Sequence, residues 1–209
     1  MRPSHAALGP FVLLLLLLLL LPVTCLAQFG APRELRNMTP TIDDAAPGDL
    51  PNPRAKVADV YAHQPVFYRT NEAPGTIIID TPRRFLYLVQ NNNTALRYGV
   101  GVGRDGFQWN GLLKITRKQE WPDWTPPEEM IQRQPYLPRW MAGGPGNPLG
   151  ARALYLGATV YRIHGTNQPQ TIGTAVSSGC FRLTNPDVTD LFERVPVGTK
   201  VVVRQRPEV

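Results

Sequence analysis

The order of hydrophobic and polar residues predicts a mainly β domain in the second part of the chain. Short runs rich in β-branched and aromatic residues alternate with turn residues, and Asn91-Asn92-Asn93 separates two such runs. This arrangement is typical of consecutive antiparallel strands joined by hairpins. We expect strands at residues 76–80, 84–90, 95–103, 111–119, 153–156, 159–164 and 199–204.

Residues 120–150 interrupt this rhythm with three of the four tryptophans, seven prolines and a glycine-rich stretch. Within this segment, Thr125 as N-cap, Pro126 at the first helical position and Glu128 at the third predict the start of a short helix. A loop of this length inside a compact domain is typical of a lid or a binding loop. We expect a stiff aromatic lid, and the alternative is an insertion packed by its own tryptophans.

A second short helix is expected near residue 185, where Asn185-Pro186 is expected to cap its start. Apolar residues then recur at helical spacing, so one face of this helix should be buried. That face consists of Val188, Leu191, Phe192 and Val195.

The N-terminus reads as an export signal. Arg2 precedes an unbroken apolar run of eleven residues, 11–21, of which nine are leucine. This run is too short for a membrane span, which needs about 20 apolar residues, and it fits the apolar region of a signal peptide cleaved after Ala27. We therefore expect export to the periplasm or cell envelope, with no stable membrane span after cleavage. Lipidation of Cys25 and an uncleaved anchor are the alternatives.

The domain organisation follows from these patterns. Prolines, Ala, Asn and Asp dominate after the signal peptide, without hydrophobic periodicity, which is typical of an extended linker. We expect a signal peptide at 1–27, a Pro-rich linker at 28–58, a lead-in segment at 59–75 and one domain at 76–204.

The charge pattern argues against a nucleic-acid partner. The formal net charge is +6, but the charges are scattered and no run of five like charges occurs. A nucleic-acid-binding surface usually needs clustered Lys and Arg. A mildly basic exported protein suits an anionic partner such as a cell-wall polymer or a membrane surface.

The candidate chemistry centres on Cys180, the one cysteine expected in the mature chain. It cannot form an internal disulfide, so it is either an inert buried side chain or a reactive thiol. His164 lies sixteen residues earlier and provides the imidazole that a reactive thiol needs. The alternative is a buried Cys beside a His with a structural role. One Cys and one His are too few for a zinc site, so no metal is expected.

The neighbours of Cys180 suit an acyl-transfer site. Gly179 allows a sharp turn before the thiol, and the amides of Gly179 and Cys180 are candidates to bind an oxyanion. Arg182 has a guanidinium that suits a substrate carboxylate. No Asp or Glu lies near His164 in the sequence, so a backbone carbonyl is the expected orienting acceptor for its ring.

These residues together resemble a known family. His164-Gly165-Thr166 followed by Ser177-Ser178-Gly179-Cys180-Phe181-Arg182 is similar to the signature of the L,D-transpeptidase (YkuD-like) catalytic domain. One position departs from the pattern, because the family usually has His where this chain has Ser178. Other agreeing stretches are Gly99-Val100-Gly101, Asn147-Pro148-Leu149-Gly150, Ile172-Gly173 and Gly198-Thr199-Lys200-Val201.

The resemblance implies a mainly β, L,D-transpeptidase-like sandwich and a reaction on peptidoglycan. In that reaction a thiolate attacks a stem peptide, a thioacyl-enzyme forms, and an amine on a second stem or on an envelope protein resolves it. No cofactor or metal is implied. The alternatives are an L,D-carboxypeptidase, in which water is the acceptor, and a non-catalytic wall-binding module. We assign catalysis to Cys180 and His164, orientation or oxyanion binding to Gly165 and Gly179, and substrate binding to Arg182, Ser178, Ser177 and Trp124.

Overall fold

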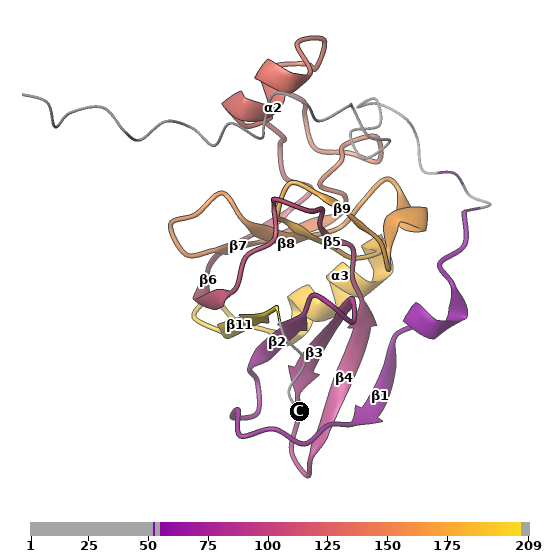
Figure 1. Cartoon of the computed structure of the whole chain (residues 1–209), viewed down its shortest axis with the longest axis vertical. Helices are drawn as coiled ribbons and strands as arrows, with labels where there is room; N and C mark the ends of the chain where they lie inside the picture. Colours follow the sequence, from indigo (N-terminus) through magenta and orange to yellow (C-terminus); the bar gives the residue numbers. More distant parts are fainter. Residues whose placement is uncertain (1–51, 53–54, 206–209) are drawn as a thin grey trace, which may run out of the picture. The chain divides into compact units, whose positions relative to one another are not determined.

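The computed structural model describes residue 52 and residues 55–205 of the chain (Figure 1). The predicted signal peptide, with Cys25, and most of the predicted linker therefore lie outside the described residues. Among the residues described, no helix is both long and apolar enough to cross a membrane.

Strands dominate the described residues, with two short α-helices, so the prediction of a mainly β fold is confirmed. In chain order the elements are η3 (Asp59–Tyr61), β1 (Gln64–Phe67), β2 (Ile77–Asp80), β3 (Phe85–Val89), β4 (Thr94–Gly99), β5 (Val102–Gly103), β6 (Gly111–Glu120), α2 (Glu128–Arg133), β7 (Arg152–Leu156), β8 (Arg162–His164), η4 (Pro169–Thr171), β9 (Ala175–Ser177), β10 (Phe181–Arg182), α3 (Asn185–Arg194) and β11 (Lys200–Arg204).

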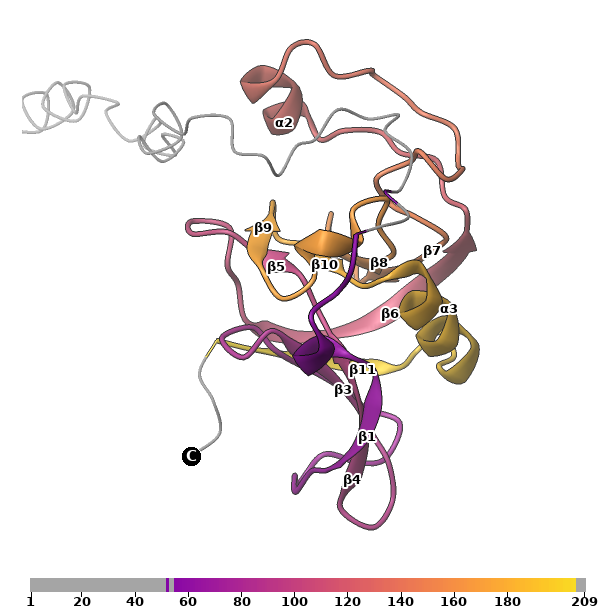
Figure 2. The same cartoon turned by 90° about the vertical axis from the view of Figure 1, so that its right-hand side faces the viewer.

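Nine of these strands form one sheet in the order β1-β4-β3-β2-β11-β6-β7-β8-β10, and β5 pairs with β9 separately. The predicted hairpins are confirmed, because β2, β3 and β4 pair antiparallel in succession. The ten-residue β6 pairs with β11 through its first half and with β7 through its second half, with an irregular register after Ile115. One strand thus joins the two halves of the sheet. Figures 1 and 2 place β1–β4 at one end and β8, β10 and α2 toward the other.

The main core contains side chains from both halves of the sheet and from α3. Its largest side chains with less than 2% of their surface exposed are Tyr98, Phe181, Ile77, Ile79, Leu86, Ile115, Leu154, Leu156, Ile163, Leu183 and Leu191. Burying each such side chain contributes roughly 1.5–3 kcal/mol, so this core supplies most of the stability that holds β8 and β10 in place.

Helix α3 packs on β7 through the predicted face, with Val188, Leu191 and Val195 buried and Phe192 partly buried (Figure 2). Its N-cap is Thr184, whose hydroxyl accepts a hydrogen bond from the Asp187 amide at 3.2 Å. The prediction that Asn185 caps this helix is therefore wrong. Asn185 is the first helical residue, and its side chain has partners elsewhere in the fold.

The predicted start of the first helix, with Thr125 as N-cap and Glu128 at the third helical position, is also wrong. Helix α2 begins at Glu128 after Pro127, and no side chain caps it. A residue that precedes a proline is pushed out of the helical region, and this applies to both Thr125 and Pro126. The helix therefore starts only after the second proline.

Two predicted strands are shorter than expected. Residues 95–103 divide into β4 and β5, and of residues 159–164 only the last three form β8. Thr159 explains the second difference, because its hydroxyl donates to the Leu156 carbonyl at 2.6 Å and accepts from the Tyr161 amide at 3.1 Å. These local side-chain bonds stabilise a turn in place of a strand.

The lead-in segment packs directly against the domain. Strand β1 pairs with β4, and the Tyr61 hydroxyl donates to the Gly173 carbonyl at 3.3 Å. A Cβ atom at Gly173 would lie only 2.0 Å from the Tyr61 ring, and one at Gly99 only 2.5 Å from Tyr61 Cβ. Glycine at both positions therefore leaves the space that this side chain occupies.

Candidate active site

Two neighbouring parallel strands bring the predicted catalytic pair together. Phe181 of β10 lies opposite Ile163 of β8, and Arg182 lies opposite His164. Continuing this register by one residue places Cys180 beside Arg162. Since alternate residues of a strand share a face, Arg162, His164, Cys180 and Arg182 lie on the same side.

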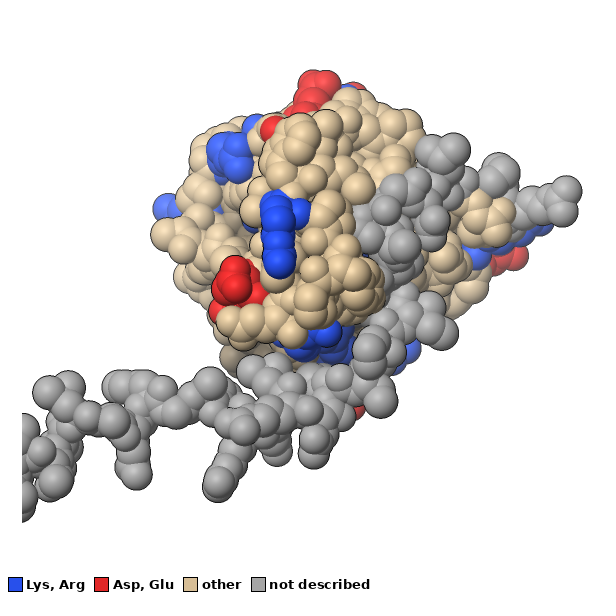
Figure 3. Space-filling model, turned by 90° about the horizontal axis from the view of Figure 1, so that it is seen from above, with Lys and Arg blue, Asp and Glu red and all other residues tan. Residues whose placement is uncertain are grey.

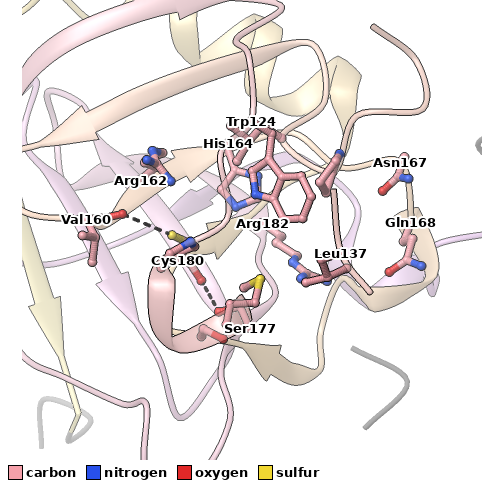
Figure 4. A pocket seen from close by; sticks show the side chains of 15 residues that line it. Trp124, Leu137, Val160, Arg162, His164, Asn167, Gln168, Ser177, Cys180 and Arg182 are labelled. Atoms are coloured by element: carbon pink, nitrogen blue, oxygen red, sulfur yellow. Dashed lines mark hydrogen bonds between the residues drawn. The ribbon is translucent and has the colours of Figure 1, made fainter. Parts of the chain in front are cut away.

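These four side chains line one pocket, shown in Figure 4. Segment 120–150 forms the opposite wall through Trp124, Met130 and Leu137, among others. Among the described residues, no Asp or Glu lines the pocket, whereas Arg162 and Arg182 both do. The cavity therefore suits an anionic ligand.

His164 is only 4% exposed and is held by its own backbone. Its Nδ1 lies 2.6 Å from the Gly165 carbonyl oxygen, which confirms the expected backbone acceptor. A carbonyl only accepts, so Nδ1 carries the proton and Nε2 remains the nitrogen that can take one. The Gly165 amide donates to the Arg152 carbonyl at 3.0 Å. Gly165 thus acts as an orienting residue and has no amide to offer an oxyanion.

Burial, together with the positive charge of Arg182, lowers the pKa of His164 to about 3. Burial raises the pKa of the Cys180 thiol, and Arg162 and Arg182 oppose that rise. The resting pair at neutral pH is therefore a thiol and a neutral imidazole. The thiol donates to the Val160 carbonyl at 3.8 Å (Figure 4), so it does not point at His164 in this state.

The turn before Cys180 is held by its own polar groups. The Ser177 hydroxyl donates to the Cys180 carbonyl at 2.5 Å and accepts from the Gly179 amide at 3.2 Å. Gly179 has φ +105°, and a Cβ there would lie 2.6 Å from the Tyr161 ring, so glycine is required. The Trp109 indole donates to the Gly179 carbonyl at 2.9 Å.

These bonds bear on two predicted roles. Ser177 lines the pocket but is only 2% exposed, and its hydroxyl is engaged both as donor and as acceptor within the turn. The Gly179 amide is already used, whereas the Cys180 amide donates to no other described residue. Of the two predicted oxyanion donors near the thiol, the geometry favours Cys180.

Only one of the three tryptophans in segment 120–150 reaches the pocket. Trp124 lines it and is 7% exposed, packed with Ile131, Leu137 and Leu149 in a small core of the segment's own. Trp121 and Trp140 are 41% and 58% exposed and do not line the pocket. Trp124 therefore contributes to the pocket wall as well as to the internal packing of the segment.

Ser178 contacts this segment. The Arg133 guanidinium of α2 donates to the Ser178 hydroxyl at 3.4 Å, and Ser178 also lines the pocket. The position at which this chain departs from the family pattern thus links the turn before Cys180 to segment 120–150.

Three residues with roles at the site were not identified from the sequence. Asn147 is 1% exposed and its amide donates to the carbonyls of Pro122 and Ala142 at 3.1 and 3.0 Å, which closes the base of segment 120–150. The second is Asn185, described next. The third is Arg162, for which the spacing of two residues before His164 on one strand was an available signal.

The Asn185 side-chain oxygen accepts from the amides of Ala151 and Thr166 at 2.9 and 3.2 Å. It thereby ties the loop after His164 to the start of β7. Within the described part of the chain, no group of three or more His, Cys, Asp or Glu residues is placed to hold a metal ion.

The outer surface near the site has its charges spread out. Figure 3 looks onto the side that carries α2, and on the coloured part of this face the basic and acidic residues lie in separate small areas.

Comparisons with known proteins give a consistent result. A model of the YkuD family, the L,D-transpeptidase catalytic domain, matches residues 74–203. The probable L,D-transpeptidases ErfK/SrfK and YbiS of Escherichia coli K12 are 39% and 40% identical over 139 and 140 residues, or 64% of this chain. The matches span less than half of those relatives, 44% and 45% of their length.

A solved structure, the Ldtfm–avibactam carbamoyl enzyme, has a TM-score of 0.52 to this chain at 18% identity. The similarity covers 65% of this chain and 51% of the other. At this identity it supports the fold alone.

Proposed function

The chain belongs to the YkuD family of L,D-transpeptidase catalytic domains, and we propose that it is an exported enzyme that uses Cys180 to acylate itself with peptidoglycan stem peptides. The observation that carries the proposal is that Cys180, the residue before β10, and His164 of β8 line the same pocket. The described lining of this pocket has two arginines and no acid. A non-catalytic module would need neither the thiol nor the oriented imidazole.

The proposed first step transfers one proton and forms one bond. Nε2 of His164 takes the thiol proton, and Sγ attacks the carbonyl of the L-centre at the third stem residue. The Cys180 amide stabilises the oxyanion of the tetrahedral intermediate. When the intermediate collapses, His164 returns the proton to the leaving amine of the terminal D-Ala, and a thioester remains.

The second step resolves the thioester. An acceptor amine attacks the thioester carbonyl, and His164 takes the excess proton from that amine. When the C–S bond breaks, His164 passes this proton to the leaving sulfur, which restores the Cys180 thiol and the neutral imidazole. An amine on a second stem gives a 3-3 cross-link, an amine on an envelope protein anchors that protein to the wall, and water gives L,D-carboxypeptidase activity. Arg182, on the same face, suits a carboxylate of the stem.

A mass measurement tests the assignment. The full chain and Cys180→Ala are incubated with a tetrapeptide muropeptide, with and without an acceptor amine, and separately with a carbapenem. The wild type should gain one acyl adduct and release D-Ala, and the variant should do neither while keeping its circular dichroism spectrum. Equal labelling of both proteins on the same peptide would contradict the role of Cys180.

The base is tested by the acylation rate at neutral pH. His164→Ala should acylate about 10²- to 10⁴-fold more slowly, the usual effect of losing a general base. His63→Ala is the matched control, because His63 lies outside the pocket and should leave the rate unchanged. A wild-type rate in His164→Ala would assign the base elsewhere.

A further inference from the structure

Arg162 occupies a position in the pocket that the proposed steps do not use. It lies on β8, and the parallel register with β10 places it next to Cys180, as His164 lies next to Arg182. Figure 4 shows Arg162, Val160 and Cys180 side by side at the pocket wall. The side chain is half buried, and its Nε is buried without a hydrogen-bond partner among the described residues.

No carboxylate of the described residues balances this cation. Arg162 forms no ion pair with any of them, and they place no Asp or Glu in the pocket wall. Its guanidinium lies 5.2 Å from the centre of the Tyr155 ring, which contacts the cation without neutralising it. A partly buried charge without a counter-charge is costly, so a site of this kind favours an anion beside it.

The group beside Arg162 that can become an anion is the Cys180 thiol. The charged or titratable groups that act on this thiol are Arg162 and Arg182, with the neutral His164 on the same face. We propose that Arg162 is the electrostatic partner of the Cys180 thiolate, and that its guanidinium stabilises the negative charge on sulfur while His164 removes the proton.

The two arginines then have separate tasks. Among the groups that oppose the raised pKa of Cys180, Arg162 has the largest effect. Among the charges that lower the pKa of His164, Arg182 has the largest effect. The register explains this division, because each arginine lies beside a different member of the pair. The proton passes from Sγ to Nε2, and Arg162 keeps all of its own protons throughout.

This inference deepens the proposed function, and it is tested on the thiol itself without any substrate. The full chain is alkylated with the uncharged reagent iodoacetamide at a series of pH values, and the rate is followed by mass spectrometry on the peptide that contains Cys180. Arg162→Gln should shift the curve of alkylation rate against pH to higher pH by about one unit or more, the usual effect of removing an adjacent opposite charge. Alkylation near neutral pH should then be about tenfold slower, because the thiolate fraction falls tenfold per unit.

Arg117→Gln is the matched control. Arg117 also lies over the Tyr155 ring, at 3.6 Å, but on β6 and outside the pocket, so its loss should leave the profile unchanged. Arg162→Lys keeps the charge and should shift the profile less than Arg162→Gln. If Arg162→Gln does not fold, Arg162→Met provides the uncharged variant, because its straight side chain keeps the packing on Tyr155.

An unchanged iodoacetamide profile in a folded, uncharged variant overturns the proposal. The proposal is also overturned if the Arg162 variant reacts more slowly with the anionic reagent iodoacetate but at the wild-type rate with iodoacetamide. Arg162 would then bind carboxylates and not the thiolate. Failure of the proposed function gives a different result, namely turnover that survives in Cys180→Ala whatever the alkylation profile of Arg162→Gln.

Discussion

Lowering the pH should destabilise this protein mainly through His164. The imidazole is 4% exposed, and its pKa in the folded protein is lowered to about 3. In the unfolded chain the ordinary value of 6.5 applies. Below pH 6.5 the unfolded chain therefore binds a proton that the folded protein does not, and the free energy of unfolding falls as the pH falls toward 3.

The size of the effect follows from the two pKa values. Each pH unit in this window removes up to about 1.4 kcal/mol of stability. Between pH 7 and pH 4.5 the loss assigned to His164 is about 2.5 kcal/mol, a large part of a typical 5–15 kcal/mol. The carboxyl of Asp190, whose pKa is lowered by Arg194, loses its contribution only as the pH falls below about 3.8, outside this window.

The assay is urea unfolding followed by tryptophan fluorescence at pH 7, 6, 5 and 4.5. His164→Gln removes the titrating group, so its stability should fall about 2.5 kcal/mol less than that of the wild type between the extremes. Burial raises the pKa of Asp187, but this carboxyl is present in both proteins and cancels in the comparison.

Equal losses in the wild type and in His164→Gln would refute the reasoning. That result would mean that His164 is already protonated near neutral pH in the folded protein. It would also remove the neutral imidazole on which the proposed proton transfer depends.

Three further predictions concern the segments around the site. Trp124→Ala should raise the ratio of hydrolysis to transpeptidation, because Trp124 lines the pocket, whereas the control Trp140→Ala changes an exposed residue and should leave the ratio unchanged. An unchanged ratio with a lowered Tm in Trp124→Ala would assign Trp124 a packing role only. Gly173→Ala should lower the free energy of unfolding by about 2–4 kcal/mol, because the position has positive φ and no room for a methyl group. Adding Tyr61→Ala should recover part of this loss, which a double-mutant cycle measures, and strict additivity would contradict the predicted contact. Asn185→Ala should lower the free energy of unfolding by about 1–3 kcal/mol for each of the two amides left without an acceptor. Asn185→Asp should restore part of this stability. Urea unfolding measures both variants, and a wild-type value for Asn185→Ala would contradict the role of Asn185.

Much of the fold was readable from local pattern. Three local features lie where the sequence predicted them: the β-branched run of β2 with the leucine and aromatic run of β3, the asparagine turn before β4, and the apolar face of α3. Each depends on residues close together in the chain. The candidate pair was readable for a different reason. A thiol that cannot form a disulfide, preceded by a histidine at a family-like spacing, is compatible with only a few kinds of chemistry.

One error lies where a side chain has two competing partners. Local rules assign the polar side chain of Asn185 to a helix cap. In the fold, its oxygen instead accepts from the amides of Ala151 and Thr166. Local sequence cannot predict this choice, because one competing partner comes from a distant segment.

The sequence by itself indicated most of the strand pattern, the candidate pair Cys180 and His164, and the family. The tertiary structure alone decided which residues surround that pair. Only the parallel pairing of β8 with β10 places Arg162 beside Cys180 and Arg182 beside His164, although each arginine is close in sequence to the other partner. The physical reason is that hydrophobic periodicity fixes which face of a strand is buried, whereas strand order and register depend on packing across the whole core.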